Sequence, residues 1–325
     1  MTSQADRPAA PEEIPARIAR GPARPMTDRR ERLDAVAITW LIGCCFLWGL
    51  NQVAAKVAIT EIAGLQQAAV RSLGGALLVW AWARWRGLPL FDADGSLRGG
   101  LLAGLLFAAE FGCIFVGLQY TTASRMVVFI YLSPFVVALG MPFIARSERL
   151  AWPQLAGLAG AFAGVAWAFA EGFTHAPPAG AGAHQWVGDT LGVLAALLWG
   201  ATTLAIRGSR LGSVSAEKTL FYQLGISGLA LTAAAALAPT PWPRALSAMA
   251  WSAMLFQTVV VCFASYLVWF WLMRRYPATR LASFTLLTPV FGLVMGALLL
   301  GEPITPRLVL ALVAVAAGIV LVNRR

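Results

Sequence analysis

The sequence predicts an all-α integral membrane protein whose ten transmembrane helices form two inverted five-helix repeats. Of its 325 residues, 59% are hydrophobic and only 12% are charged, whereas soluble domains carry about 25% charged residues. Apolar runs of about 20 residues recur along the chain, and each is long enough to cross the hydrocarbon core of a bilayer as a helix. An internal duplication predicts the two repeats.

The duplication is clearest where segment 121–134 aligns without a gap with segment 276–289. The matched pairs are Ala123 and Ala278, Arg125 and Arg280, Phe129 and Phe284, and Pro134 and Pro289. Further matches are Glu148 with Glu302, Gly164 with Gly318, and Leu47-Trp48-Gly49 with Leu198-Trp199-Gly200. Self-similarity at this spacing indicates a duplicated unit of about 150 residues.

Residues 1–32 are rich in Pro, Arg and Ala and lack apolar periodicity, so we expect a disordered basic tail there. The predicted spans are 36–57, 67–85, 97–118, 123–144, 151–170, 187–206, 219–238, 250–273, 279–300 and 304–322. The chain therefore divides into the tail, a first repeat at 36–170 and a second repeat at 187–323.

The positive charges predict how these spans are oriented. With the N-terminus in the cytoplasm, the tail, the loops after even-numbered spans and the C-terminus hold twenty of the 25 Lys and Arg residues. The opposite side holds only Arg244 and Arg307. This asymmetry follows the positive-inside rule, so both termini are expected in the cytoplasm.

Five spans per repeat is an odd number, so the second copy enters the membrane from the opposite side. Inverted repeats of this kind are common in secondary transporters, where the substrate site lies near the membrane midplane at the repeat interface. The sequence pattern thus favours a transporter.

The chain also resembles EamA-type permeases of the drug/metabolite transporter superfamily over about residues 36–323. The motifs that carry the resemblance are Trp48-Gly49-x-Asn51-x-x-Ala54-x-Lys56, Arg71, Tyr120-Thr-Thr-Ala123, Ser133-Pro134, Glu148-Arg149-Leu150 and Leu300-Gly301-Glu302-Pro303, with a glycine ladder at Gly157, Gly160 and Gly164. The resemblance implies a ten-helix carrier that exports small metabolites, often amino acids or their analogues. Because the family is mostly bacterial, it also implies a location in the bacterial inner membrane.

Two matched prolines, Pro134 and Pro289, are predicted near the middle of spans 123–144 and 279–300. A proline removes a helix hydrogen bond and kinks the helix, and such kinks are also tolerated as plain packing features of membrane helices. Because each proline follows a hydroxyl residue at the matching repeat position, we expect hinges that line a substrate cavity.

Glu110 is the only acidic residue that the predicted spans place deep in the membrane. A charge at that depth costs several kcal/mol unless it is paired or neutral. Two hypotheses follow: a carboxylate that carries protons for coupled transport, and a structural counter-ion for Lys56, Arg71 or Arg125.

The same three basic residues form a predicted positive cluster that could hold an anionic substrate group. Long basic side chains near span ends also reach the interface simply by extending toward it. We expect this second arrangement for Arg125, because Arg280 repeats it at the opposite membrane face. For Lys56 and Arg71 both possibilities stay open.

Trp48 and Trp199 are the two tryptophans furthest from any predicted interface, and each indole N–H needs a partner there. Two roles remain possible for these tryptophans: packing in the core, or lining the wall of the substrate cavity. Asn51 and Tyr131 are further polar candidates for the cavity.

Other classes of function are disfavoured. The four cysteines lie in apolar runs without metal-ligand spacing, so we expect packing residues and neither a metal nor a cofactor. The chain lacks a phosphate-binding Gly-x-x-x-x-Gly-Lys-Ser/Thr loop, and its basic loops suit membrane orientation better than nucleic-acid binding. The expected partners are the lipid bilayer and a small metabolite, with protons as a candidate coupling ion. An integral-membrane enzyme and a non-transporting scaffold are the alternatives.

Overall fold

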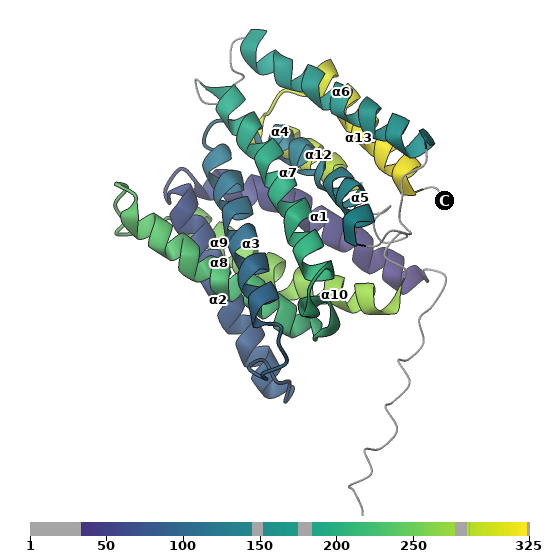
Figure 1. Ribbon diagram of the computed structural model, residues 1–325. Helices are drawn as coiled ribbons and strands as arrows, with labels where there is room; N and C mark the ends of the chain where they lie inside the picture. Colours follow the sequence, from purple (N-terminus) through teal and green to yellow (C-terminus); the bar gives the residue numbers. More distant parts are fainter. Residues whose placement is uncertain (1–33, 145–151, 175–183, 277–284, 286, 324–325) are drawn as a thin grey trace, which may run out of the picture.

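The computed structural model describes residues 34–144, 152–174, 184–276, 285 and 287–323, and every element in these ranges is helical (Figure 1). The first part of the chain forms α1 (Ala35–Ala58), α2 (Gly64–Trp85), α3 (Leu97–Gly117), α4 (Ala123–Ile130), α5 (Ser133–Ile144) and α6 (Trp152–Thr174). The second forms α7 (Gln185–Arg207), the 3₁₀ turn η1 (Arg210–Ser213), α8 (Ala216–Leu237), α9 (Ala248–Leu255), the π-helix η2 (Phe256–Ser265), α10 (Tyr266–Arg275), α12 (Leu287–Leu300) and α13 (Pro306–Asn323).

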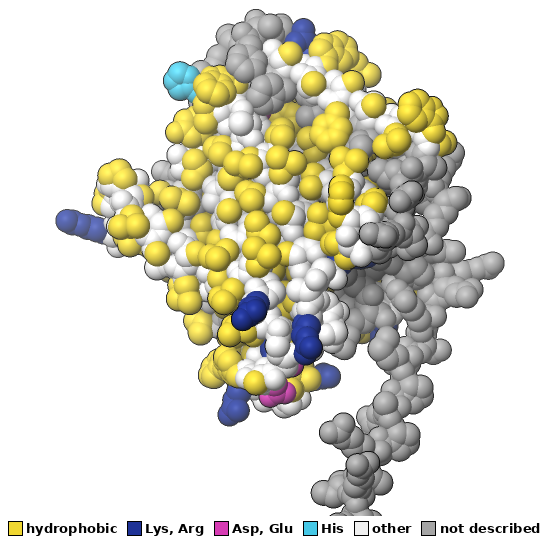
Figure 2. All heavy atoms as spheres, in the orientation of Figure 1, with side chains coloured by type: hydrophobic (Ala, Val, Ile, Leu, Met, Phe, Trp, Pro, Cys, Tyr) yellow, Lys and Arg dark blue, Asp and Glu magenta, His cyan; other side chains and the backbone are white. Residues whose placement is uncertain are grey.

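Among the described residues, six helical stretches are long and apolar enough to cross a membrane: Ala35–Ala58, Leu97–Gly117, Ala123–Ile144, Gln185–Arg207, Ala216–Leu237 and Ala248–Leu272. Shorter apolar helices lie at Leu155–Gly164, Leu287–Leu300 and Pro306–Gly318. Hydrophobic side chains spread over the middle of the face seen in Figure 2, whereas Lys and Arg side chains sit toward its margins. This distribution suits a surface that contacts lipid tails.

Most predicted spans agree with the observed helices to within a few residues. Two of them have structure that periodicity did not predict. The predicted helix 123–144 is interrupted at Tyr131 and Leu132, and the predicted helix 250–273 contains the π-helix η2. The tail 1–32, Glu148, His175, Ala278 and Arg280 lie outside the described residues.

Several helices begin where a short polar side chain caps them. Asp34, Thr122, Ser215 and Ser247 each accept a hydrogen bond from the backbone N–H three residues later, at the starts of α1, α4, α8 and α9. Such caps satisfy N–H groups that the first helical turn leaves without partners.

When the helices of the two halves are matched in chain order, a contact between two helices recurs between their two counterparts. This matching pairs α1 with α7, α2 with α8, α3 with the α9–η2–α10 segment, α4 and α5 with α12, and α6 with α13. Accordingly α6 packs on α13 and α2 on α8. The α3–α7 contact has its counterpart in α1 against α9–η2–α10, and the α1–α12 contact in α7 against α4 and α5.

Close helix contacts in this arrangement rely on glycine. A Cβ atom added to Gly104 of α3 would lie 2.5 Å from the Ile226 side chain of α8, and one added to Gly49 of α1 would lie 2.7 Å from the backbone of Gly292 in α12. The small-residue motif at Gly100 and Gly104 therefore forms a packing seam between α3 and α8.

Candidate functional site

The candidate site lies where the π-helix η2 meets α1 and α2. A π-helix has i→i+5 hydrogen bonds, is rare, and often occurs at functional sites. Its buried polar residues Gln257, Cys262 and Ser265 turn toward α1 and α2. Gln257 donates to the Oε1 of Gln67 (2.9 Å), while Ser265 accepts from the indole N–H of Trp48 (2.9 Å).

Arg71 of α2 is the charged residue at the centre of this site and is only 1% exposed. Its Nε and Nη2 atoms donate to the Sγ of Cys262 at 3.1 and 2.8 Å, and Nη2 also lies 3.5 Å from the hydroxyl of Tyr266. The guanidinium carbon sits 4.3 Å from the centre of the Phe111 ring. Within the described part of the chain, its Nη1 has no hydrogen-bond partner.

Glu110 of α3 lies at the same depth as Arg71. Each residue is seven positions from a helix end, Gly117 for Glu110 and Gly64 for Arg71, which corresponds to about 10 Å of helix. Glu110 is 4% exposed, and the ring of the next residue, Phe111, lies 4.3 Å from the guanidinium carbon of Arg71. The Oε2 atom of Glu110 has no hydrogen-bond partner among the described residues, so this oxygen forms no hydrogen bond to Arg71.

The tryptophans extend this site on both sides. Trp48 packs edge-on against Trp269 (5.2 Å between ring centres) and Tyr266 (6.4 Å). Trp199 of α7 packs edge-on against Tyr131 at 5.9 Å. Asn51, less than one turn beyond Trp48 on α1, is 7% exposed, and its Oδ1 has no partner among the described residues.

Tyr131 sits at the interruption between α4 and α5, beside Thr288 of α12. Pro134 is the second residue of α5, where a proline costs no helix hydrogen bond because the first-turn N–H groups have no partner. The predicted mid-span kink at Pro134 is therefore wrong in its geometry: the helix stops at Ile130 and restarts at Ser133. Pro289 is the third residue of α12, directly after Thr288.

Lys56 of α1 lies apart from this site, at the end of α3. Its Nζ donates to the carbonyl oxygens of Leu118 (2.5 Å) and Thr121 (2.7 Å). These carbonyls follow the last turn of α3, where a positive charge is favourable. The half-buried ammonium group thus holds the α3–α4 connection in place.

The same connection is held by Glu302, which follows α12. Its carboxylate accepts from the backbone N–H groups of Ala123 (2.8 Å) and Ser124 (2.9 Å) and from the Ser124 hydroxyl (2.6 Å). A carboxylate at a helix N-terminus is stabilised by the helix dipole and by these N–H donors. Glu302 therefore fixes the start of α4 to the second part of the chain.

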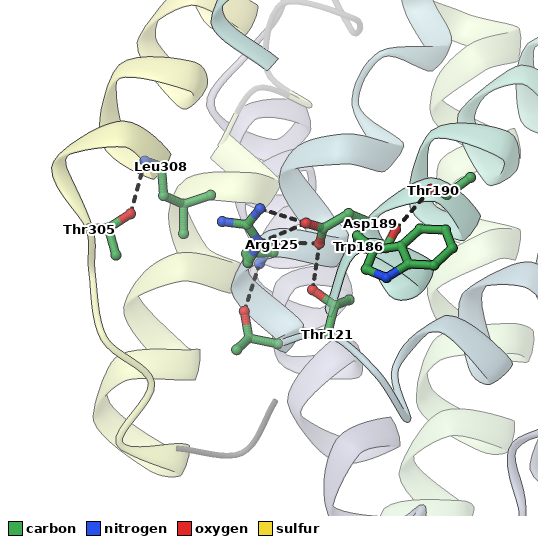
Figure 3. A network of polar contacts seen from close by, with 8 residues as sticks. Thr121, Arg125, Trp186, Asp189, Thr190, Thr305 and Leu308 are labelled. Carbon is green, nitrogen blue, oxygen red and sulfur yellow. Dashed lines mark hydrogen bonds and ion pairs between the residues drawn. The ribbon is translucent and has the colours of Figure 1, made fainter. Parts of the chain in front are cut away.

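Arg125 does not extend toward the interface, and the expectation that it does is wrong. The Arg125 guanidinium pairs with the Asp189 carboxylate of α7 through Nη2–Oδ2 at 2.6 Å, and the two side chains are 4% and 0% exposed. Figure 3 shows the Thr121 hydroxyl on the same carboxylate, at 2.6 Å. Asp189 lies inside α7, so its burial required a basic partner, and the sequence contained that signal.

At the opposite end of α2 and α3, the loop carboxylate of Asp94 meets Lys218 of α8. The Lys218 ammonium donates to the Asp94 carboxylate and to the Asp92 carbonyl, both at 2.8 Å. Hydrogen bonds from Lys218 and Ser96 hold the pKa of Asp94 well below its usual range. Asp94 and Lys218 therefore form an ion pair between this loop and α8.

With this geometry in place, comparisons with known proteins identify the family. The sequence pattern of the EamA-like transporter family matches the chain twice, at residues 35–170 and 186–324. The chain belongs to the EamA-like transporter family.

Relatives of this EamA-like protein span nearly its whole length. The uncharacterized transporter YvbV of Bacillus subtilis is 29% identical over 290 residues, covering 86% of this chain and 88% of the relative. The uncharacterized protein PA1977 of Pseudomonas aeruginosa is 29% identical over 297 residues, covering 91% and 96%. A crystal structure with 18% identity has a TM-score of 0.61 and covers 89% of this chain and 96% of the other, so the two share a fold.

The EamA-like chain is thus a multi-pass membrane protein of a transporter family. Of the nine residues predicted for its cavity, the structure places Trp48 and Arg71 against η2, and Asn51 and Glu110 on the helices α1 and α3 that border this region. It places Tyr131 and Pro134 at the junction of α4 and α5, Trp199 on α7 and Pro289 on α12. It leaves Lys56 outside. Sequence analysis missed Cys262, Ser265 and Tyr266, because their partners Arg71 and Trp48 are about 190 to 220 residues away in the chain.

Proposed function

We propose that this protein is a secondary transporter that exports small metabolites, such as amino acids or their analogues, by alternating access between its two halves. The observation that carries the proposal is the pair of buried, opposite charges at Arg71 and Glu110. Each has a polar atom without a partner among the described residues, although a buried polar group left unpaired is costly. Unpaired buried polar atoms are expected at a binding site, because the ligand supplies the missing hydrogen-bond partner.

We infer that the two five-helix halves are inverted relative to each other, as alternating access requires. The family pattern matches each half separately, and the contacts of α2 with α8 and of α6 with α13 join matching helices of the two halves. The aligned residues Thr121 and Tyr276 add a further correspondence: the Thr121 hydroxyl donates to Asp189 in α7, and the Tyr276 hydroxyl donates to Asp34 at the start of α1. Two halves built alike and inserted in opposite directions can exchange conformations to expose one central site to either side.

We further propose a bacterial inner-membrane location with both termini in the cytoplasm, since the basic residues concentrate on that side. In this orientation Glu61 lies outside and Asp92 inside. An impermeant maleimide should label a cysteine placed at position 61 on intact cells, and one at position 92 only after the cells are opened. The reverse pattern contradicts the orientation.

Within the proposed cavity, Arg71, Glu110, Trp48 and Tyr131 contact the substrate, together with Asn51 and Trp199. The interruption at Tyr131 and Leu132, just before Pro134, supports a place for the cavity there, because discontinuous helices form substrate sites in other transporters. Pro289 holds the matching position in α12. Lys56, whose ammonium group is used by two carbonyls, positions the α3–α4 connection.

Accumulation by proteoliposomes tests this function. Purified protein is reconstituted and offered a mixture of amino acids and related metabolites, with and without an imposed pH gradient. Accumulation that an uncoupler abolishes supports a proton-coupled carrier, and equilibration without accumulation supports a carrier that uses no proton gradient. If folded protein moves none of the solutes, the carrier proposal is contradicted.

Glu110→Gln then separates the two roles of Glu110. A proton carrier loses gradient-driven accumulation but still exchanges substrate across the membrane. A structural counter-ion loses thermal stability and both kinds of transport together.

A further inference from the structure

Three basic side chains stood out in the sequence as possible holders of an anionic group, and the structure separates them. Lys56 donates to two backbone carbonyls, and Arg125 pairs with the Asp189 carboxylate. Arg71 is the exception among the three. Its Nε–Nη2 edge points at the sulfur of Cys262.

Sulfur is a poor partner for that edge. A cysteine sulfur is a weak acceptor, whereas a carboxylate accepts two parallel N–H bonds from a guanidinium and forms one of the strongest hydrogen-bonded pairs in proteins. Arg71 is 1% exposed, so water does not compensate for the weak contact. Its Nη1 also lacks a partner among the described residues.

The surroundings of Arg71 hold the guanidinium in a fixed plane. Phe111 and Phe115 lie 4.3 and 5.3 Å from its central carbon, measured to the ring centres, and cations are attracted to aromatic faces. The Tyr266 hydroxyl lies beside Nη2. The donors are therefore arranged before any anion arrives, which reduces the ordering cost of binding.

We propose that the Nε–Nη2 edge of Arg71 is the binding site for a carboxylate group of the transported metabolite, and that the Cys262 sulfur holds this place while the site is empty. This inference rests on the proposed transport function and names the chemical class of its substrate. The carboxylate displaces the thiol by a rotation of the Cys262 side chain and takes over both N–H donors. No covalent bond forms or breaks.

Glu110 restricts the class further. It precedes Phe111, whose ring centre lies 4.3 Å from the guanidinium carbon of Arg71, and its Oε2 lacks a partner in the described part of the chain. Lys56 and Arg125 donate to other groups, so a second negative group on the substrate gains no cation from them, while an amino group gains an acceptor in Glu110. The site therefore favours monocarboxylates that also carry an amino group over dicarboxylates and phosphates.

The thermal unfolding of the purified full-length protein in detergent tests the carboxylate site without knowledge of the natural substrate. The probe is sodium acetate, compared with sodium chloride at equal ionic strength and with acetamide as the uncharged analogue. Acetate should raise the unfolding temperature of the wild type and of Arg84→Gln, an exposed arginine on the same helix, because a ligand that binds only the folded state stabilises it. It should have no effect on Arg71→Gln. An equal shift in Arg71→Gln, or no shift in the wild type, overturns the proposal.

Cys262→Asp provides a second test that needs no added ligand. A permanent carboxylate at this position should pair with Arg71, raise the unfolding temperature above that of the matched Cys262→Asn variant, and remove the response to acetate. In the Arg71→Gln background the order should reverse, since the buried carboxylate then has no cation. If Cys262→Asp is less stable than Cys262→Asn in both backgrounds, the sulfur does not mark a carboxylate position.

The outcomes also distinguish this proposal from the transport function. If proteoliposomes transport solutes but none of these Arg71-dependent effects is found, the transport function is supported and the carboxylate site is contradicted. If acetate stabilises the protein through Arg71 but the protein moves no solute, the carboxylate site is supported and the transport function is contradicted.

Discussion

The ion pair between Arg125 and Asp189 illustrates how much single residues contribute to this fold. Both side chains are almost fully buried, and Thr121 donates to the same carboxylate. Removing one partner of a buried pair leaves the other charge without compensation, which costs about 3–5 kcal/mol.

We therefore expect Asp189→Asn to lower the free energy of unfolding by about this amount, as measured by denaturant unfolding in detergent. Thr190→Ala is the matched control, because Thr190 is the next residue, is exposed, and bonds only its own helix through the Trp186 carbonyl. Comparable unfolding of the wild type and Asp189→Asn would show that the pair contributes little.

The ion pair of Asp94 with Lys218 predicts a dependence on pH. Because the folded state lowers the pKa of Asp94, its contribution to stability is complete above the unfolded-state pKa of about 4 and is lost as the pH falls through the folded-state value. Asp94→Asn should therefore lower the unfolding temperature at pH 7, and its difference from the wild type should begin to shrink only below about pH 4.

Asp92→Asn is the control for this experiment, since Asp92 contacts Lys218 through its backbone carbonyl, which the substitution keeps. A difference between Asp94→Asn and the wild type that is the same at pH 7 and at strongly acidic pH would contradict the pairing.

Part of the site could be predicted at the residue scale. Arg71 and Glu110 stood out because a charge within an apolar run is costly and needs a reason. Cys262 did not, because its contact with Arg71 joins residues 191 positions apart and a cysteine in an apolar run is normally a packing residue. Arg125 was misjudged because its repeat partner Arg280 suggested an interfacial position, whereas its true partner, Asp189, lies on another helix.

At the scale of elements, the π-helix η2 is the feature that aligns the site. Gln257 and Cys262 are five residues apart, and i→i+5 hydrogen bonding places them on one face. That face meets Gln67 and Arg71, which are four residues apart on one face of α2. In a regular α-helix, residues five apart point about 140° away from each other, so both contacts could not form together.

Deletion of Val259 from η2 should therefore separate these two contacts. Val259 is 41% exposed, so its side chain is not needed for the core, but removing one residue favours α-helical geometry. We expect ΔVal259 to insert into the membrane and to lose solute exchange in proteoliposomes, while Val259→Ala keeps exchange at the wild-type level. Normal exchange by ΔVal259 would show that the π-helix does not align the site.

Helix positions were largely predictable from sequence, because long apolar runs bounded by polar caps determine them. The interruption of 123–144 and the π-helix in 250–273 were not. Both are departures from regular hydrogen bonding within continuous apolar runs, where hydropathy carries no signal. The proline at 134 indicated that the helix was disturbed there, but the sequence could not show that α4 ends before it.

At the scale of the molecule, the contacts between helices are similar in the two halves of the chain. The α1–α12 contact corresponds to the contacts of α7 with α4 and α5, and α2 packs on its own counterpart α8. The two halves are not chemically identical, however. The π-helix lies in the counterpart of α3, and α3 itself is a regular α-helix that supplies Glu110. The first half supplies Arg71 and Glu110 from two neighbouring helices, and the second half supplies the sulfur of Cys262. A site shared in this way is consistent with the proposed carrier, whose halves move against each other.

The most direct test of this account is solute exchange by proteoliposomes that contain wild-type protein, Arg71→Gln or Arg84→Gln, each shown to be folded by its unfolding temperature. Vesicles preloaded with an unlabelled amino acid mixture are given traces of the labelled compounds, and their uptake is followed. The account predicts exchange of at least one carboxylate-bearing compound by the wild type and Arg84→Gln, and its loss in Arg71→Gln. Exchange at the wild-type rate by Arg71→Gln would contradict a substrate site at Arg71.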